Sequence, residues 1–228
     1  MRKFFWITII AVALVALAFI SPWRQIRFDF AGLFGLQQQE KTSGLVVSSF
    51  AGKINVYIDG KLEGNATSDT PLVLPKVTPG DRLLKLERET TVPLAYMTYS
   101  KLVAFLPGSE AQISYELGPS PEFSGGHLIY VGGIPTSDKA NLRLNVKANT
   151  SDVEVFIDNG SIGKLPINSY QLPVKSQYKL ELRKNGYETQ SFTILPEVQA
   201  DRDKLGGLDL MVEVDLFLQP IKVNLEVN

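Results

Sequence analysis

Two aspartates that end nearly identical phrases are the first residues of this sequence that could do chemistry. Residues 55–59 read Asn-Val-Tyr-Ile-Asp, and residues 154–158 read Glu-Val-Phe-Ile-Asp. Two carboxylates that face each other across a cleft can serve as general acid and base. An Asp before Gly or Asn-Gly is more often a turn former that bonds nearby backbone N–H groups. Because Asp59 and Asp158 occupy equivalent places in a repeated pattern, we predict that both are structural. The other turn residues of the two hairpins are predicted to be Gly60, Gly64, Gly160 and Gly163.

The sequence offers no complete set of residues for metal or nucleophilic chemistry. Carboxylates gather between residues 197 and 209, but Arg202 interrupts them and their spacing is not that of a calcium loop. The chain has no cysteine and a single histidine, His127, which excludes thiolate sites and sites that need two imidazoles. Ser109 lacks the two flanking glycines of a nucleophile elbow. We therefore predict no catalytic residue, no metal site and no cofactor.

Aromatic side chains supply the one binding chemistry that the sequence leaves open. Tyrosine rings stack on the apolar faces of sugars and peptides while the hydroxyl offers a polar tip. The candidate ligand or partner surface consists of Tyr96, Tyr99 and Tyr130. The competing interpretation is that these rings pack in a core or between neighbouring strands.

The composition describes a folded protein without an affinity for nucleic acid. The 228 residues are 44% hydrophobic and 21% charged, as in ordinary globular proteins. A formal net charge of −1 gives no reason to expect the basic face that binds DNA or RNA. No nucleic-acid partner is therefore predicted.

The first 24 residues predict a membrane anchor. A basic N-terminus precedes an uncharged apolar run of 17 residues, Phe4–Ile20, and Trp23 suits the membrane interface. The alternative is a secretory signal peptide cleaved after Ala18, and either interpretation exports the rest of the chain. We predict a single-pass cell-membrane protein bound to the lipid bilayer by this helix. Its N-terminus would be cytoplasmic, and residues 25–228 would be extracytoplasmic.

The sequence beyond residue 43 predicts β-structure throughout. Short alternating apolar runs are separated by Gly, Pro, Asn and Asp, and no segment has a sustained helical period. The order of runs and turns occurs twice, which indicates two copies of one domain. We predict an all-β fold of two tandem small antiparallel β-sandwich domains behind one transmembrane helix.

The predicted parts follow one another along the chain. They are a signal anchor (1–24), a juxtamembrane linker (25–43), a first domain (44–119), a linker with a short strand (120–141), a second domain (142–220) and a C-terminal edge strand or tail (221–228). The short strand His127–Val131 either completes the first domain or bridges the two, because an isolated strand would leave its backbone unpaired.

The same motifs occur in the same order in both copies. The first has Asp59-Gly60, Gly64, Thr70-Pro71-Leu72, Pro79-Gly80 and Leu84-Lys85-Leu86, and the second has Asp158, Gly163, Leu165-Pro166, Tyr178-Lys179-Leu180 and Gly186-Tyr187-Glu188. This order resembles the PEGA domain family over residues 44–119 and 142–220, although neither copy contains the Pro-Glu-Gly-Ala string. The resemblance implies small β-sandwich modules of envelope proteins, often repeated beside a membrane anchor and without an active site.

These expectations favour a non-enzymatic cell-envelope protein that acts as a scaffold, a spacer or a protein-interaction module. Its partners would be other envelope proteins or cell-wall glycans. One route to a partner is pairing of an exposed edge strand such as Ile221–Glu226. The alternative function is a carbohydrate- or peptide-binding surface module that uses an exposed aromatic face.

Overall fold

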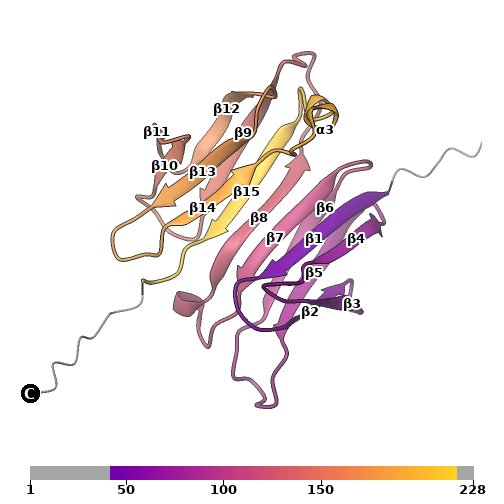
Figure 1. Cartoon of the computed structure of the whole chain (residues 1–228), viewed down its shortest axis with the longest axis vertical. Helices are drawn as coiled ribbons and strands as arrows, with labels where there is room; N and C mark the ends of the chain where they lie inside the picture. The colour runs from indigo at the N-terminus through magenta and orange to yellow at the C-terminus, as the bar shows by residue number, and fades with distance from the viewer. Residues whose placement is uncertain (1–41, 220–228) are drawn as a thin grey trace, which may run out of the picture. The chain divides into compact units, whose positions relative to one another are not determined.

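The computed structural model describes residues 42–219, which form almost entirely β-structure, as the sequence predicted (Figure 1). The predicted anchor, nearly all of the juxtamembrane linker and the tail 221–228 lie outside these residues. Between residues 42 and 219, no helix is long and apolar enough to cross a membrane.

The strands are short and are joined mostly by turns. They are β1 (Ser43–Ser49), β2 (Ile54–Ile58), β3 (Lys61–Ala66), β4 (Leu72–Val77), β5 (Gly80–Arg88), β6 (Tyr99–Phe105), β7 (Glu110–Glu116), β8 (Gly125–Gly132), β9 (Asn141–Ala148), β10 (Glu154–Ile157), β11 (Gly160–Lys164), β12 (Ile167–Pro173), β13 (Tyr178–Arg183), β14 (Gln190–Ile194) and β15 (Asp209–Asp215). A 3-10 turn, η2 (Pro121–Phe123), precedes β8, and a short helix, α3 (Gln199–Asp203), lies between β14 and β15.

Three sheets contain these strands. A seven-stranded sheet has the order β12-β9-β15-β8-β7-β1-β4, and two four-stranded sheets have the orders β3-β2-β5-β6 and β11-β10-β13-β14. We call β1–β7 the first half and β9–β15 the second half, because their pairing is the same. In each half the first strand pairs in parallel with the last, β1 with β7 and β9 with β15. The order of strands thus repeats as the motifs do.

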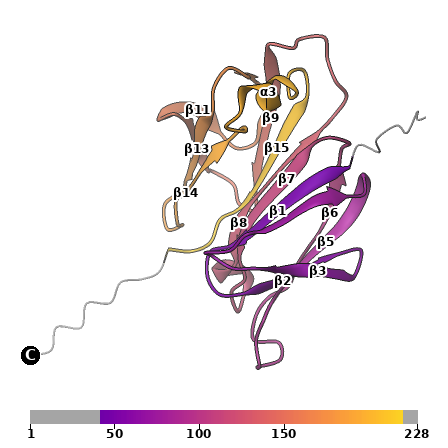
Figure 2. The same ribbon diagram turned by 45° about the vertical axis from the view of Figure 1, so that its right-hand side comes forward.

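Strand β8 is the central strand of the seven-stranded sheet. It pairs antiparallel with β7 of the first half and with β15 of the second. Successive side chains of a strand point to opposite faces. Leu128 accordingly packs in one hydrophobic core, and Ile129 and Val131 pack in the other. The two four-stranded sheets therefore cover opposite faces of the seven-stranded sheet (Figure 2).

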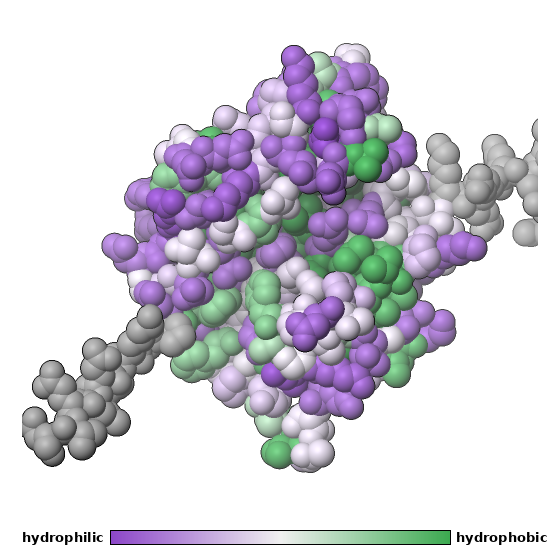
Figure 3. All heavy atoms as spheres, viewed as in Figure 1, coloured by the Kyte–Doolittle hydropathy of each residue, from purple (hydrophilic) through white to green (hydrophobic). Residues whose placement is uncertain are grey.

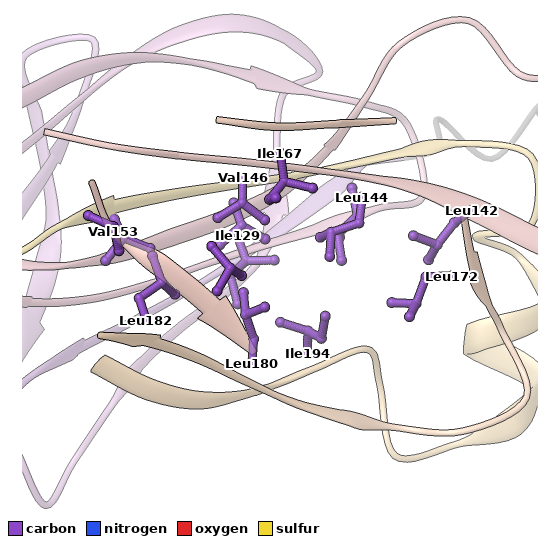
Figure 4. Close-up of a cluster of buried hydrophobic side chains, with 14 of the residues drawn as sticks. Ile129, Leu142, Leu144, Val146, Val153, Ile167, Leu172, Leu180, Leu182 and Ile194 are labelled. Carbon is purple, nitrogen blue, oxygen red and sulfur yellow. The ribbon is translucent and has the colours of Figure 1, made fainter. Parts of the chain in front are cut away.

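Each half buries its own hydrophobic core between two sheets. In the second half, Leu144 of the seven-stranded sheet packs with Leu180 and Ile194 of the four-stranded sheet, and all three are fully buried (Figure 4). In the first half, Leu45 and Ile113 pack in the same way with residues such as Leu84. Full burial of one such side chain contributes about 2 kcal/mol, so these clusters hold the sheets together.

The prediction that Gly64 and Gly163 are turn residues was wrong. They lie inside β3 and β11, at the point where each strand shifts register against its partner. A β-bulge bends the strand, and glycine adopts the positive φ that such a bend can require without steric cost. The φ of Gly163 is 121°. A Cβ atom on Gly64 would lie 2.8 Å from Cδ1 of Leu72. The repeated glycines therefore bend the second strand of each hairpin instead of ending it.

Candidate binding surfaces beside the central strand

Asp59 and Asp158 lie in the turns after β2 and β10, with φ values of 50° and 47°. Oδ1 of Asp59 accepts a hydrogen bond from the N–H of Leu83 at 2.9 Å, and Oδ1 of Asp158 accepts one from the N–H of Lys179 at 2.8 Å. The backbone N–H of each aspartate donates to the carbonyl of that same leucine or lysine. The bonded groups belong to the neighbouring strands β5 and β13 and not to the turns themselves. Each carboxylate thus fastens a hairpin tip to the adjacent strand.

The glycines of these turns have different backbone conformations in the two halves. Gly60 has a φ of 81° next to Asp59, whereas in the second half the corresponding positive φ belongs to Asn159, at 69°, and Gly160 opens β11. Asn tolerates the left-handed region better than most residues do. Both turns therefore use residue types suited to a tight hairpin.

The three candidate tyrosines do not form one exposed aromatic face. Tyr96 is 38% exposed in the segment between β5 and β6, with the guanidinium of Arg88 5.0 Å from its ring centre. Tyr99 on β6 and Tyr130 on β8 are partly buried against the core of the first half. Burial, and then the charges of Asp215 and Tyr130, raise the pKa of Tyr99. The structure therefore brings Tyr99 and Tyr130 together and leaves Tyr96 as the exposed ring.

A polar cluster joins the halves on the face of β8 that carries Tyr130. Glu213 of β15 accepts a hydrogen bond from the Tyr130 hydroxyl at 2.9 Å. It also pairs with Lys101 of β6 and, at 3.1 Å, with Lys147 of β9, while its side chain is only 10% exposed. We define the polar junction as these residues together with the Tyr115 hydroxyl and the Asp215 carboxylate that it bonds at 2.8 Å: Lys101, Tyr115, Tyr130, Lys147, Glu213 and Asp215.

Sequence reasoning missed the acids of this junction, although a signal for them was present. In β15, Glu213 and Asp215 alternate with the buried residues Val212 and Val214. Acids at Asp209, Glu213 and Asp215 on one side of the strand, opposite apolar residues on the other, indicate that this side meets charged partners and not a core. The partner residues themselves come from β6 and β9, which only the folded chain brings together.

His127 lies on the opposite face of β8 and is held by aromatic rings. Its ring stacks on Phe192 of β14 with the ring centres 3.8 Å apart and the planes 14° from parallel. Nδ1 is buried without a hydrogen-bond partner among the described residues. Burial lowers the pKa of His127 to about 4, so the ring is neutral at neutral pH. His127 therefore acts as a flat packing residue between the sheets.

A groove opens on the same face of the seven-stranded sheet, beside the end of β14. Its volume is about 410 Å³, and Figure 3 shows hydrophobic atoms inside a hollow on this face. We call this cavity the β14 groove. Its apolar lining includes Ile129 and Val131 of β8, with Leu195, Leu205 and Leu210, and its polar lining includes Thr42, Glu110, Gln112, Asp201 and Lys204. No sequence motif marked this cavity.

The carboxylates of the acidic segment after β14 form ion pairs with basic side chains of the chain itself. Asp201 pairs with Lys204 at 2.6 Å, and Asp209 pairs with Arg143. Arg202 donates to the carbonyl of Pro196 at 2.7 Å. Across residues 42–219, no cluster of three His, Cys, Asp or Glu side chains is arranged to hold a metal ion.

No protein-family model matches this sequence, and no curated protein matches it. The resemblance to the PEGA family therefore rests on the order of sequence motifs alone.

Proposed function

We propose that this protein is a membrane-anchored extracytoplasmic protein of the cell envelope that serves as a non-enzymatic scaffold and protein-interaction module. In this proposal each half is a PEGA-like β-sandwich domain and residues 1–24 are the anchor. The observation that carries it is the position of β8, which pairs with strands of both halves. A strand shared by two cores resists a hinge motion, because bending would break two hydrogen-bond ladders.

The environment of the candidate catalytic groups supports a non-enzymatic role. Asp59 and Asp158 are 99 residues apart in sequence, belong to different halves and are each bonded to backbone. His127 stacks on Phe192. In the described part of the chain, no hydrogen bond joins it to Ser114, its cross-strand partner on β7. Within residues 42–219, none of these three candidate groups is therefore hydrogen-bonded to a nucleophilic side chain.

The aromatic-face alternative receives less support. A sugar-binding platform needs rings that stand clear of the protein with free polar tips. The Tyr130 hydroxyl is bonded to Glu213, and Tyr99 packs with its ring centre 4.5 Å from that of Tyr115. Only Tyr96 of the three offers an exposed ring.

Protease treatment of intact cells tests the proposed location. A non-permeant protease should remove the epitopes of residues 42–219, after outer-layer permeabilisation where a second membrane is present, while a cytoplasmic marker stays intact. Complete protection of the chain under conditions that degrade a known surface protein would overturn the extracytoplasmic assignment. An N-terminal epitope tag that remains with the membrane fraction would support the anchor over a cleaved signal peptide.

A further inference from the structure

We infer that the β14 groove takes an extended segment of a partner protein, which adds as a strand to the free edge of β14. The segment would place apolar side chains over Ile129 and Val131 and a basic side chain near Glu110. This inference rests on the proposed role as a protein-interaction module and assigns that role a site.

The backbone of β14 offers the hydrogen-bonding groups that such a strand needs. The N–H of Lys179 on β13 bonds Asp158, and its carbonyl accepts from the same residue, so both groups point away from β14. Thr193 lies opposite Lys179. Residues of an antiparallel ladder alternate between hydrogen-bonded and non-hydrogen-bonded pairs, and Lys179 and Thr193 form a non-hydrogen-bonded pair. The backbone N–H and C=O groups of Thr193, and of Ser191 two residues away, therefore point outward. No other hydrogen bond to them is present in residues 42–219.

The other edges of the described sheets carry features that oppose strand addition. Edge strands β4 and β12 contain Pro75 and Pro173, which cannot donate to a ladder. Edge strands β3 and β11 are bulged at their glycines. Strand β14 reads Gln-Ser-Phe-Thr-Ile, without proline, charge or bulge. Proteins normally protect edges with such features, so their absence marks β14 as the edge open to a partner.

The equivalent edge in the first half is β6, which an ion pair ties to the seven-stranded sheet. Leu102 of β6 lies opposite Leu83, which bonds Asp59 as Lys179 bonds Asp158, so Leu102 corresponds to Thr193. Next to Leu102, Lys101 reaches across to Glu213 and to the rest of the polar junction. Within residues 42–219 no ion pair ties β14 to the seven-stranded sheet, and the apolar groove opens beside its end.

The lining of the groove specifies the chemistry of the occupant. A volume of about 410 Å³ accommodates a few side chains and not a folded domain. Lys204 is paired with Asp201, whereas Glu110 makes no ion pair within the described part of the chain. Glu110 accepts a hydrogen bond from the Gln112 amide at 3.1 Å, and its negative charge at the rim favours a Lys or Arg in the bound segment. Alternating apolar residues would follow from strand geometry, since every second side chain faces the groove.

Selection of peptides on the purified full chain in mild detergent tests the inference. A phage-displayed library of random peptides should yield binders that alternate apolar residues and carry a Lys or Arg. Thr193→Pro removes an outward N–H and should weaken these binders about fivefold, since each strand hydrogen bond is worth about 1 kcal/mol. Leu102→Pro, the matched change on the edge of β6, should leave their affinity unchanged.

A second variant keeps the test independent of the strand backbone. Gln112→Arg changes an exposed side chain that lines the groove, and it should abolish binding by filling the cavity and repelling the basic residue. The inference fails if no peptide is enriched, or if the binders retain full affinity for Thr193→Pro and Gln112→Arg. It also fails if peptides bind only after residues 221–228 are deleted, because the chain's own tail would then be the occupant. Peptide binding is measured without cells, so its outcome is separate from that of the protease experiment.

Discussion

At the scale of single residues, the same side chain performs the same task in both halves. Asp59 and Asp158 each clamp a turn to the neighbouring strand through one carboxylate oxygen. The hydrogen bond from the Leu83 N–H, and then Arg82 at 3.1 Å, lower the pKa of Asp59. A carboxyl whose pKa is lowered on folding stabilises the fold above its unfolded value of 3.8, and this contribution is lost as the pH falls toward the folded value.

We therefore expect Asp59→Asn to flatten the acid side of the stability profile. Asn keeps an oxygen acceptor for the Leu83 N–H and tolerates the positive φ, but it does not titrate. Urea unfolding at about pH 5 and about pH 3 should show a smaller loss of unfolding free energy for the variant than for the unchanged chain. Identical losses in the two proteins would show that this carboxylate does not contribute.

The buried His127 side chain should give the free energy of unfolding a second pH dependence, with a different cause. Burial lowers the pKa of His127 from 6.5 to about 4, so the unfolded chain binds a proton at a pH where the folded chain does not. Stability is then full above about pH 6.5 and falls by roughly 3 kcal/mol as the pH drops to about 4. His127→Phe, which preserves the stack on Phe192, should remove this slope. A slope that persists in the variant would assign the dependence to other groups.

At the scale of elements, the alternating pattern predicted strands well and their partners poorly. The run around Val155 and the one around Leu180 were expected as strands from local sequence alone, and both are strands. The place of β8 was left open, because a pattern of side chains does not say which backbone lies beside it. A clue was nevertheless present: Leu128, Ile129 and Val131 form a nearly continuous apolar run, which is typical of a strand buried on both faces.

The candidate tyrosines and the β14 groove show why binding surfaces are harder to predict than strands. The tyrosines were grouped by residue type, but Tyr99 and Tyr130 are placed against a core by strand pairing that the sequence did not reveal. The β14 groove arises where the end of β14 passes above β8, so its lining comes from distant parts of the chain. Cavities of this kind depend on the spacing between sheets, for which local residue patterns carry no information.

The polar junction ties β6 and β9 to β15, so its disruption should lower the free energy of unfolding. Glu213→Gln removes the charge shared by Lys101 and Lys147 in a site that is only 10% exposed. Because Glu213 is largely buried while Lys101 and Lys147 stay 31% and 56% exposed, the change should cost about 1–3 kcal/mol of unfolding free energy in urea titrations. Glu89→Gln is the matched control, because Glu89 pairs with Lys53 at 2.7 Å on the surface and should cost less than about 1 kcal/mol. Equal effects of the two changes would contradict a structural role for the junction.

At the scale of the whole described chain, β8 joins the two halves in one continuous sheet. Strand β7 ends the first repeat and β15 ends the second, and both pair with β8. Loss of β8 would therefore expose a strand edge in each half. Leu128 is buried in the first core and Ile129 in the second, although the two residues are adjacent. Removal of either side chain therefore opens a cavity in one half through a strand that both halves share.

We accordingly expect Leu128→Ala to destabilise the second half as much as the first. Truncation of a buried leucine costs about 2–5 kcal/mol, and a shared strand passes this loss to both cores. Hydrogen exchange should report equal decreases in protection for the amides of Val47 in β1 and Val146 in β9. Ile129→Ala, which faces the other core, should produce the same pair of decreases. Loss of protection confined to the first half in Leu128→Ala and to the second half in Ile129→Ala would mean that the halves unfold separately. The protein would then behave as two domains on a linker, and the continuous sheet would not act as a rigid platform.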